Sequence, residues 1–406
     1  MSAQENWEVQ AMKYDKMTNQ DMMHLIHTAD EPQKHMGAVV APIFMNSLHV
    51  FDRIEDFEAL NGYEYDKYLY TRDCNPTVAV LEQKIAALDH GKRATVFSSG
   101  MAAFSAAVMA TCRAGSHIIC MWDAYTTVKD ALERVFIPMM DLQITYVFGE
   151  DMQEIEDAIR ENTALMILES PASACFRAVD LRAIAEIARR HGVKTYIDNS
   201  NASPVFQKPL DMGIDISMNS ISKYISGHSD VCGGVLVTND DALNRKLVED
   251  IREHTGGIMG PMEAWLAIRG LRTLEVRMKR IHETGLAVAE YLEKHPKVRK
   301  VHYSGLASHP QADLLATQQT GHGGLMSFLL DTDDIHEVHA FVNRLKVFQR
   351  GGSWGGHESL VLLAFHGMPQ EELEKMRADE KLVRIYCGLE GSDNLIADLE
   401  QALVDV

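Results

Sequence analysis

Short apolar runs alternate with helix-length amphipathic stretches through most of residues 75–255. The runs that predict strands lie at 94–97, 117–121, 143–147, 164–168, 194–197, 214–219 and 233–237. Helices are predicted at 77–89, 101–111, 126–136, 152–161 and 181–190. Strands that alternate with helices of this length require right-handed crossovers. The pattern therefore predicts an α/β fold, with a mainly parallel sheet and helices on both of its faces.

This alternation stops on both sides, which predicts three parts in the 406 residues. Residues 1–65 are polar, mixed and rich in methionine, and predict an N-terminal arm with a short helix that reaches a neighbouring subunit; disorder is the alternative. Residues 66–260 form the predicted large α/β domain. Residues 261–406 begin with a helical connector, 261–295, and continue as a smaller α+β domain with helices at 335–345 and 394–404.

Composition narrows the class of protein. Hydrophobic residues make up 46% and charged residues 24%, as in ordinary globular proteins. The net charge of −19 disfavours nucleic acid and anionic membranes as main partners. No apolar run reaches about 18 residues, so no transmembrane helix is expected. The six cysteines form no CxxC pair and the N-terminus has no signal pattern, so we expect no metal site and a cytoplasmic location.

Lys223 is the strongest chemical candidate. It lies in a polar, glycine-bearing stretch between two apolar runs, and Ser220 and Ser222 precede it by three residues and one residue. A lysine amine condenses with an aldehyde, and hydroxyls bind an anion. Pyridoxal 5′-phosphate (PLP) carries both groups, an aldehyde and a phosphate. A solvated loop lysine is the alternative.

Other polar residues follow predicted strands, at the edge where parallel α/β sheets bind ligands. Gly100 and Met101 open a helix whose free amides suit a phosphate; a plain serine N-cap is the alternative. Asp198 suits the pyridine nitrogen of PLP, or else caps a turn. Tyr125 could stack on the ring, or else be a half-buried tyrosine.

Three further residues suit anions. Tyr70 and Arg72 precede the first helix of the large domain, where an arginine binds phosphate through a fork of donors. The alternative for Arg72 is a surface ion pair. Arg384 lies in an apolar strand and needs a carboxylate partner, for which a substrate carboxylate or Glu390 would serve. The structural alternatives do not predict all of these residues in one chain in this order.

These motifs resemble the trans-sulfuration (Cys/Met metabolism) family of PLP enzymes over about residues 36–403. The family includes cystathionine γ-synthase, cystathionine γ- and β-lyases and methionine γ-lyase. The segments that carry the resemblance are 70–77, 98–103, 198–199, 220–229, 305–324, 355–360 and 384–390. The resemblance implies PLP fold type I, with a mainly parallel seven-stranded sheet in the large domain. It also implies a homotetramer built from tight dimers.

The resemblance assigns each candidate residue a role. Lys223 would hold PLP and then move protons, with Tyr125 as the second catalytic residue, stacked on the ring. Asp198 would pair with the ring nitrogen. The phosphate would be held by Gly100, Met101, Ser220 and Ser222, and by Tyr70 and Arg72 of a neighbouring subunit. Arg384 and Ser353 would bind the substrate.

Several positions depart from the family pattern. Ser173 stands where an asparagine usually touches the PLP 3′-oxygen. The other departures are Asn201, Trp354, His357 and Tyr386. We expect these changes to gather around the substrate side chain and to alter its choice. The expected reaction is γ-elimination or γ-replacement on an L-amino acid of the thioether or O-acylhomoserine type. A β-eliminating carbon–sulfur lyase is the second reading, and a PLP-binding protein without catalysis is the third.

Overall fold

Seven short strands form the larger of two sheets in the computed structural model, which describes residues 17–60 and 68–404. The strands are β1 Arg93–Phe97, β2 His117–Met121, β3 Gln143–Val147, β4 Thr163–Glu169, β5 Lys194–Asp198, β6 Ile216–Ser220 and β7 Gly234–Thr238. Their order is β1-β7-β6-β5-β4-β2-β3, and only β7 runs antiparallel to its neighbours. The predicted mainly parallel sheet is confirmed.

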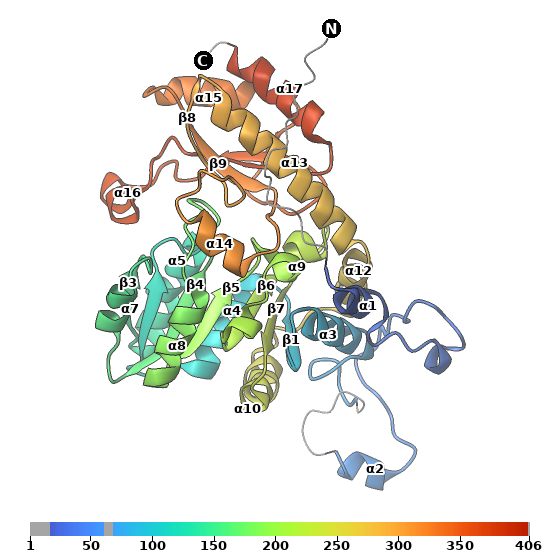
Figure 1. Cartoon of the computed structure of the whole chain (residues 1–406). Helices are drawn as coiled ribbons and strands as arrows, with labels where there is room; N and C mark the ends of the chain where they lie inside the picture. The colour runs from blue at the N-terminus through green and yellow to red at the C-terminus, as the bar shows by residue number, and fades with distance from the viewer. Residues whose placement is uncertain (1–16, 61–67, 405–406) are drawn as a thin grey trace.

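Helices lie on both faces of this sheet (Figure 1). They are α3 Pro76–Leu88, α4 Gly100–Thr111, α5 Thr126–Ala131, α6 Ile137–Met140, α7 Met152–Ala158, α8 Leu181–His191 and α10 Asp241–Arg245. The connections through α7 and α8 step along the sheet in the opposite direction to those through α4 and α5. Right-handed crossovers therefore place the two pairs on opposite faces. Strand β2 is buried along its whole length, as expected for a parallel strand covered on both sides.

Polar caps fix where several of these helices begin. The side chain of Asn75 accepts from the Thr77 amide before α3, and Asp180 accepts from Ala183 before α8. A cap of this kind stabilises a helix by about 1 kcal/mol. The sequence therefore sets the helix starts, and with them the loops that follow the strands.

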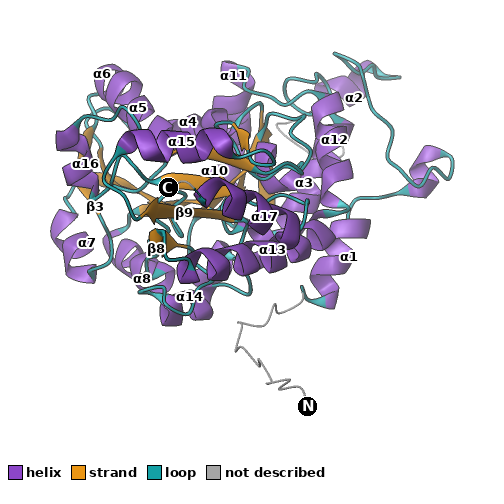
Figure 2. Cartoon of the chain, turned by 90° about the horizontal axis from the view of Figure 1, so that it is seen from above, coloured by secondary structure: helices purple, strands orange, loops and turns teal. Residues whose placement is uncertain are grey.

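Five strands form the smaller sheet, in the order β10-β11-β12-β9-β8. They are β8 Val298–His302, β9 Leu325–Leu330, β10 Gln349–Arg350, β11 Leu360–Leu363 and β12 Val383–Tyr386. Helices α13 Leu274–Lys294, α15 Ile335–Arg344 and α17 Ser392–Leu403 cover this sheet, and Figure 2 shows them above the larger sheet. The sequence pattern missed β8, β10 and β11, and also the short helices α14 Ala312–Gln318 and α16 Gln370–Met376. The domain boundaries at 65 and 260 stay predictions.

The predicted connector consists of two helices, α12 Pro261–Leu271 and α13 Leu274–Lys294. Figure 1 shows α13 running from the larger sheet to the smaller one. The buried side chain of Arg277 in α13 donates to the carbonyl oxygens of Tyr224 at 2.7 Å and Gly270 at 2.8 Å. This contact ties the connector to the residues that directly follow Lys223.

The described part of the predicted arm contains α1 Asn19–His27, the 3-10 turn η1 Pro32–His35 and α2 Ile54–Glu58, joined by loops that project from the molecule (Figure 1). Residues 1–16 and 61–65 of the arm lie outside the described residues. Helix α1 is tied to α3 through Lys84, whose Nζ donates to the carbonyl oxygen of Ile26 in α1 at 3.1 Å and lies 2.9 Å from Oδ2 of Asp30, just beyond the helix. Within 17–60 and 68–404, no helix is long and apolar enough to cross a membrane.

Candidate active site

A cavity of about 230 Å³ opens at the carboxyl ends of β4, β5 and β6. The sequence-predicted residues that line it are Gly100, Met101, Tyr125, Ser173, Asp198, Ser220, Ser222, Lys223 and Arg384. Gly352 and Trp354, on either side of Ser353, line it as well. Because Arg384 comes from β12 and Trp354 from the loop before β11, both sheets contribute to the cavity. The structure thus brings together most of the predicted site.

Lys223 lies at a kink within the short helical segment Ile221–Ile225, and its own backbone is not helical, with φ −96° and ψ −128°. Its Nζ donates to Ser353 Oγ at 2.7 Å and stands 5.2 Å from the centre of the Trp354 ring. Burial and the nearby charge of Arg384 lower the pKa of Lys223. A lowered pKa increases the share of neutral amine, which is the form that reacts with an aldehyde.

Gly355 permits the close approach of another loop to this turn. Its φ is +91°, and a Cβ there would lie 2.9 Å from the Cα of Lys223. Only glycine tolerates both that backbone conformation and that distance. The loop that carries Ser353 and Trp354 is therefore held directly against the lysine.

Two acidic residues, Glu169 and Asp198, end neighbouring parallel strands and are paired in register. Asp198 Oδ1 accepts from the Ser200 amide at 2.9 Å, and burial raises the pKa of Asp198. Burial and the charge of Asp198 raise the pKa of Glu169 to about 8. The sequence analysis gave Glu169 no role, although it follows an apolar strand just as Asp198 does. That shared position is the signal which could have found it.

The start of α4 forms another wall of the cavity. Ser99 Oγ accepts from the Ala102 amide at 3.0 Å, so Ser99 is indeed an N-cap. The first amides of a helix have no intrahelical acceptor, and the first two residues of α4, Gly100 and Met101, line the cavity. A Cβ on Gly100 would stand 3.5 Å from Ser220 Oγ, which shows how near that hydroxyl lies. Amides and hydroxyls of this kind suit a phosphate group.

Arg384 is a largely buried cation in β12. Its Nη1 lies 3.5 Å from the carbonyl oxygen of Ser173, and no ion pair joins it to an acid within the described chain. Glu390, the alternative partner, instead accepts from the amide and hydroxyl of Ser359 at 2.7 and 2.8 Å. Burial lowers the pKa of Arg384. A buried guanidinium without a protein carboxylate suits a ligand that brings one.

Tyr70 and Arg72 do not reach this cavity within one chain. They line a separate surface hollow, where the guanidinium of Arg72 lies 5.1 Å from the Tyr70 ring centre and 3.6 Å from Asp73 Oδ1. The contact with Asp73 is the surface ion pair that the sequence analysis gave as the alternative role of Arg72. Their expected role in the site of a neighbouring subunit stays a prediction.

The departures from the family pattern divide into two groups. Ser173, Asn201 and Trp354 line the cavity, as expected. Tyr386 does not line it: its hydroxyl donates to the Gly356 carbonyl at 2.8 Å and its ring packs near Tyr224, behind the lysine turn. The His357 side chain is 62% exposed beside Glu358. The expected gathering of all these changes around the substrate therefore does not hold for Tyr386 and His357.

The donor set fits PLP. A lysine amine of lowered pKa, that of Lys223, and the carboxylate of Asp198 line the same cavity. Helix amides and hydroxyls stand together at one end, as the phosphate requires.

Comparisons with known proteins agree with this geometry. The family described as "Cys/Met metabolism PLP-dependent enzyme" matches residues 23–404. The chain is 34% identical to the cystathionine gamma-lyase of Dictyostelium discoideum, over 94% of this chain and 96% of the relative. It is also 34% identical to the cystathionine beta-lyase MetC of Bacillus subtilis, with the same coverage. The crystal structure of metB from Corynebacterium glutamicum superposes with a TM-score of 0.89 at 32% identity, covering 96% of this chain and 98% of that one.

Proposed function

The chain belongs to the Cys/Met metabolism family of PLP-dependent enzymes, and from that premise we propose that it catalyses γ-elimination or γ-replacement on an L-amino acid. The fold is PLP fold type I and the cofactor is PLP. The proposed substrate carries its leaving group on Cγ, as a thioether or an O-acyl group. One observation carries the proposal: Lys223, Asp198 and Arg384 line the same cavity.

Each part of the cavity would hold one part of the cofactor. Gly100, Met101, Ser220 and Ser222 would bind the phosphate, and the half-exposed ring of Tyr125 would lie against the pyridine ring. Asp198 would keep a proton on the ring nitrogen, since a buried carboxylate is stabilised by a cationic neighbour. When bound, PLP withdraws electrons from the substrate, so that protons leave Cα and Cβ more readily.

Lys223 would move those protons. Its lowered pKa increases the share of neutral amine that can act as a base, and Ser353 Oγ, 2.7 Å from Nζ, keeps the amine in place. Arg384 and Ser353 would bind the substrate, the guanidinium through the α-carboxylate. That contact would hold Cα within reach of Lys223 and supply the ion-pair partner that Arg384 lacks among the described residues.

The β-eliminating lyase stays the second candidate, since the chain is equally identical to a relative named for each reaction. Cystathionine separates the two, because γ-elimination releases 2-oxobutanoate and β-elimination releases pyruvate. We expect 2-oxobutanoate from purified enzyme supplied with PLP. Pyruvate as the main product would refute the γ assignment. The proposed function would be refuted if no thioether or O-acylhomoserine, with or without an added thiol, gave either a 2-oxo acid or a γ-substituted amino acid.

A homo-oligomer, with two tight dimers forming a tetramer in the cytoplasm, is part of the same proposal. The arm exposes large apolar side chains, among them Met36, Val39 and Val50 at 103%, 80% and 87%. Exposed apolar residues grouped on a projecting segment are typical of an interface. Tyr70 and Arg72 would then enter the cavity of the neighbouring subunit.

A further inference from the structure

Glu169 is a buried acid beside the cavity that none of the roles above uses. It ends β4 with 4% of its surface exposed. Its Oε2 accepts from the Tyr125 amide at 2.7 Å, and its Oε1 accepts from the Ser173 amide at 2.7 Å. Tyr125 and Ser173 belong to different loops, and both line the cavity. One carboxylate therefore fixes two parts of the wall.

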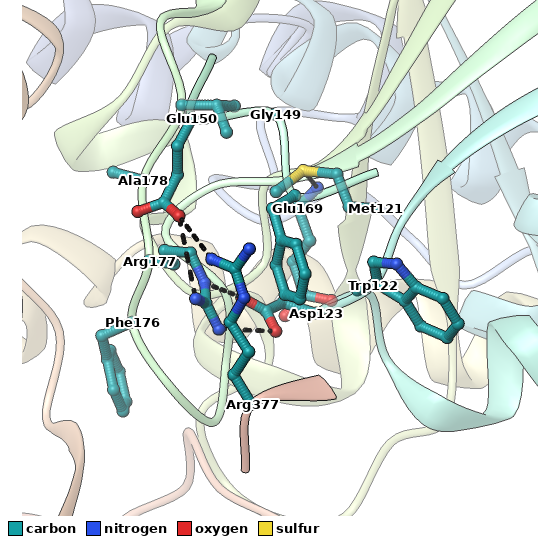
Figure 3. A network of polar contacts seen from close by, with 12 residues as sticks. Met121, Trp122, Asp123, Gly149, Glu150, Glu169, Phe176, Arg177, Ala178 and Arg377 are labelled. Carbon is teal, nitrogen blue, oxygen red and sulfur yellow. Dashed lines mark hydrogen bonds and ion pairs between the residues drawn. The ribbon is translucent and has the colours of Figure 1, made fainter. Parts of the chain in front are cut away.

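Tyr125 depends on this contact more than its neighbours do. Its side chain is 49% exposed, so packing does little to fix it. The earlier part of the same turn has other anchors: Arg177 Nε lies 2.5 Å from Asp123 Oδ2, as Figure 3 shows, and Lys129 Nζ donates to the Trp122 carbonyl at 3.0 Å. Loss of Glu169 would therefore release Tyr125 while the turn itself stays in place.

The carboxylate of Glu169 also holds Ser173 in place, through the Ser173 amide. The carbonyl oxygen of Ser173 is also the atom that Arg384 Nη1 approaches, at 3.5 Å. Glu169 thus joins the tyrosine, the serine and, through that serine, the arginine of the cavity. The charge of Glu169 also favours the cationic form of Arg384.

We propose that Glu169 is a positioning residue, whose carboxylate sets where the Tyr125 ring and the Ser173 hydroxyl stand in the cavity. The proposal rests on the function proposed above, which assigns Tyr125 to the face of the cofactor ring. A glutamine at this position keeps the shape but offers an NH₂ donor to one of the two amide donors. One of the two contacts must then break, and one backbone amide loses its acceptor.

The chain offers a matched control in Glu154 of α7. Its Oε2 accepts from the Gly149 amide at 2.9 Å and from the Phe148 amide at 3.1 Å, so it too binds two backbone amides with one carboxylate. Glu154 does not line the cavity. Glu154→Gln therefore removes the charge of an amide-binding carboxylate away from the cofactor, while the oxygen that remains can still accept from both amides. It controls for loss of charge and for the Glu→Gln substitution itself.

The experiment compares wild type, Glu169→Gln, Glu169→Asp and Glu154→Gln at about pH 9, above the pKa of Glu169, so that this side chain is a carboxylate in the wild type. Three quantities are measured: the thermal midpoint of each apoprotein, the PLP dissociation constant from cofactor absorbance, and kcat and KM on a Cγ-substituted amino acid. We expect Glu169→Gln to weaken PLP binding and lower kcat by about tenfold or more, with a smaller change in KM. Glu154→Gln is expected to lower only the thermal midpoint.

A double variant tests whether Glu169 acts through Tyr125. In a Tyr125→Ala background, Glu169→Gln is expected to weaken PLP binding far less than it does alone, because the ring it positions is gone. If Glu169→Gln changes PLP binding and kcat no more than Glu154→Gln does, or if its effect on PLP binding is undiminished without Tyr125, the proposal is wrong.

Two further outcomes are separable. If Glu169→Gln does not fold, Glu169→Asp is the decisive variant, because it keeps the charge but moves the carboxylate back by one methylene. The proposal would be overturned if Glu169→Asp had the thermal midpoint, the PLP affinity and the kcat of the wild type. A wild type that binds no PLP would refute the proposed function instead.

Discussion

Replacing Arg384 with glutamine tests both the substrate contact and the electrostatics of Lys223. The guanidinium is largely buried and has no protein carboxylate partner in the described residues, so the proposed substrate supplies one. Hydrogen bonds to charged groups contribute about 1.5–3 kcal/mol each, and a carboxylate can take two from a guanidinium. Loss of both corresponds to about 3 kcal/mol or more, or about a 100-fold rise in KM.

A second effect follows from charge. Arg384 is, after burial, the main cause of the lowered pKa of Lys223. Removing its positive charge raises that pKa, so at a given pH more of the amine is protonated and less can react. PLP binding slows at low pH, where the amine is protonated. In Arg384→Gln this slowing is therefore expected to begin at a higher pH than in the wild type. Arg384→Lys, which keeps the charge but not the fork of donors, is expected to raise KM without this shift.

The assay is stopped-flow absorbance of PLP binding to the apoprotein as a function of pH, together with steady-state kinetics. The reasoning is refuted if Arg384→Gln leaves KM within about twofold of wild type. It is equally refuted if the pH dependence of PLP capture is the same in wild type and both variants.

Three other predictions follow from the structure. Asp198→Asn is expected to lower kcat by about 100-fold at saturating PLP, because a neutral amide does not keep the ring nitrogen protonated; unchanged turnover would remove Asp198 from the mechanism. Burial raises the pKa of Asp89 from 3.8 to about 7, so the folded state loses stability as the pH rises between those values, by roughly 4 kcal/mol at the upper end. In urea unfolding at about pH 8, Asp89→Asn is therefore expected to be more stable than the wild type, and near pH 4 the two are expected to be equally stable. A stability difference that does not change with pH would contradict this prediction. Co-assembly of inactive Lys223→Ala and Arg72→Ala chains is expected to restore part of the activity, since one shared site in each hybrid dimer is intact. No recovery in hybrid dimers would contradict the shared site.

The sequence predicted the cavity well because its residues follow parallel strands. Asp198 and Ser220 end neighbouring strands, and the carboxyl ends of such strands meet at one edge. Arg384 was harder to place, because its distance from Ser173 depends on how the smaller sheet packs on the larger one, and no local pattern encodes that packing.

Glu169 was missed for a related reason. Its role depends on two backbone amides in separate loops, and an amide donor exists at nearly every residue, so the sequence cannot show which ones are bound. Tyr386 was misplaced because a strand residue points to one face or the other, and a one-residue choice of register reverses that. The edge strand β8 is polar and half-exposed, so its apolar pattern is weak.

Reduction of the purified enzyme with borohydride, followed by peptide mass spectrometry, tests the central claim most directly, because it makes the bond between a lysine and the cofactor aldehyde permanent. The account predicts a single pyridoxyl phosphate group, attached to Lys223. Attachment to a different lysine, or to none, would contradict it.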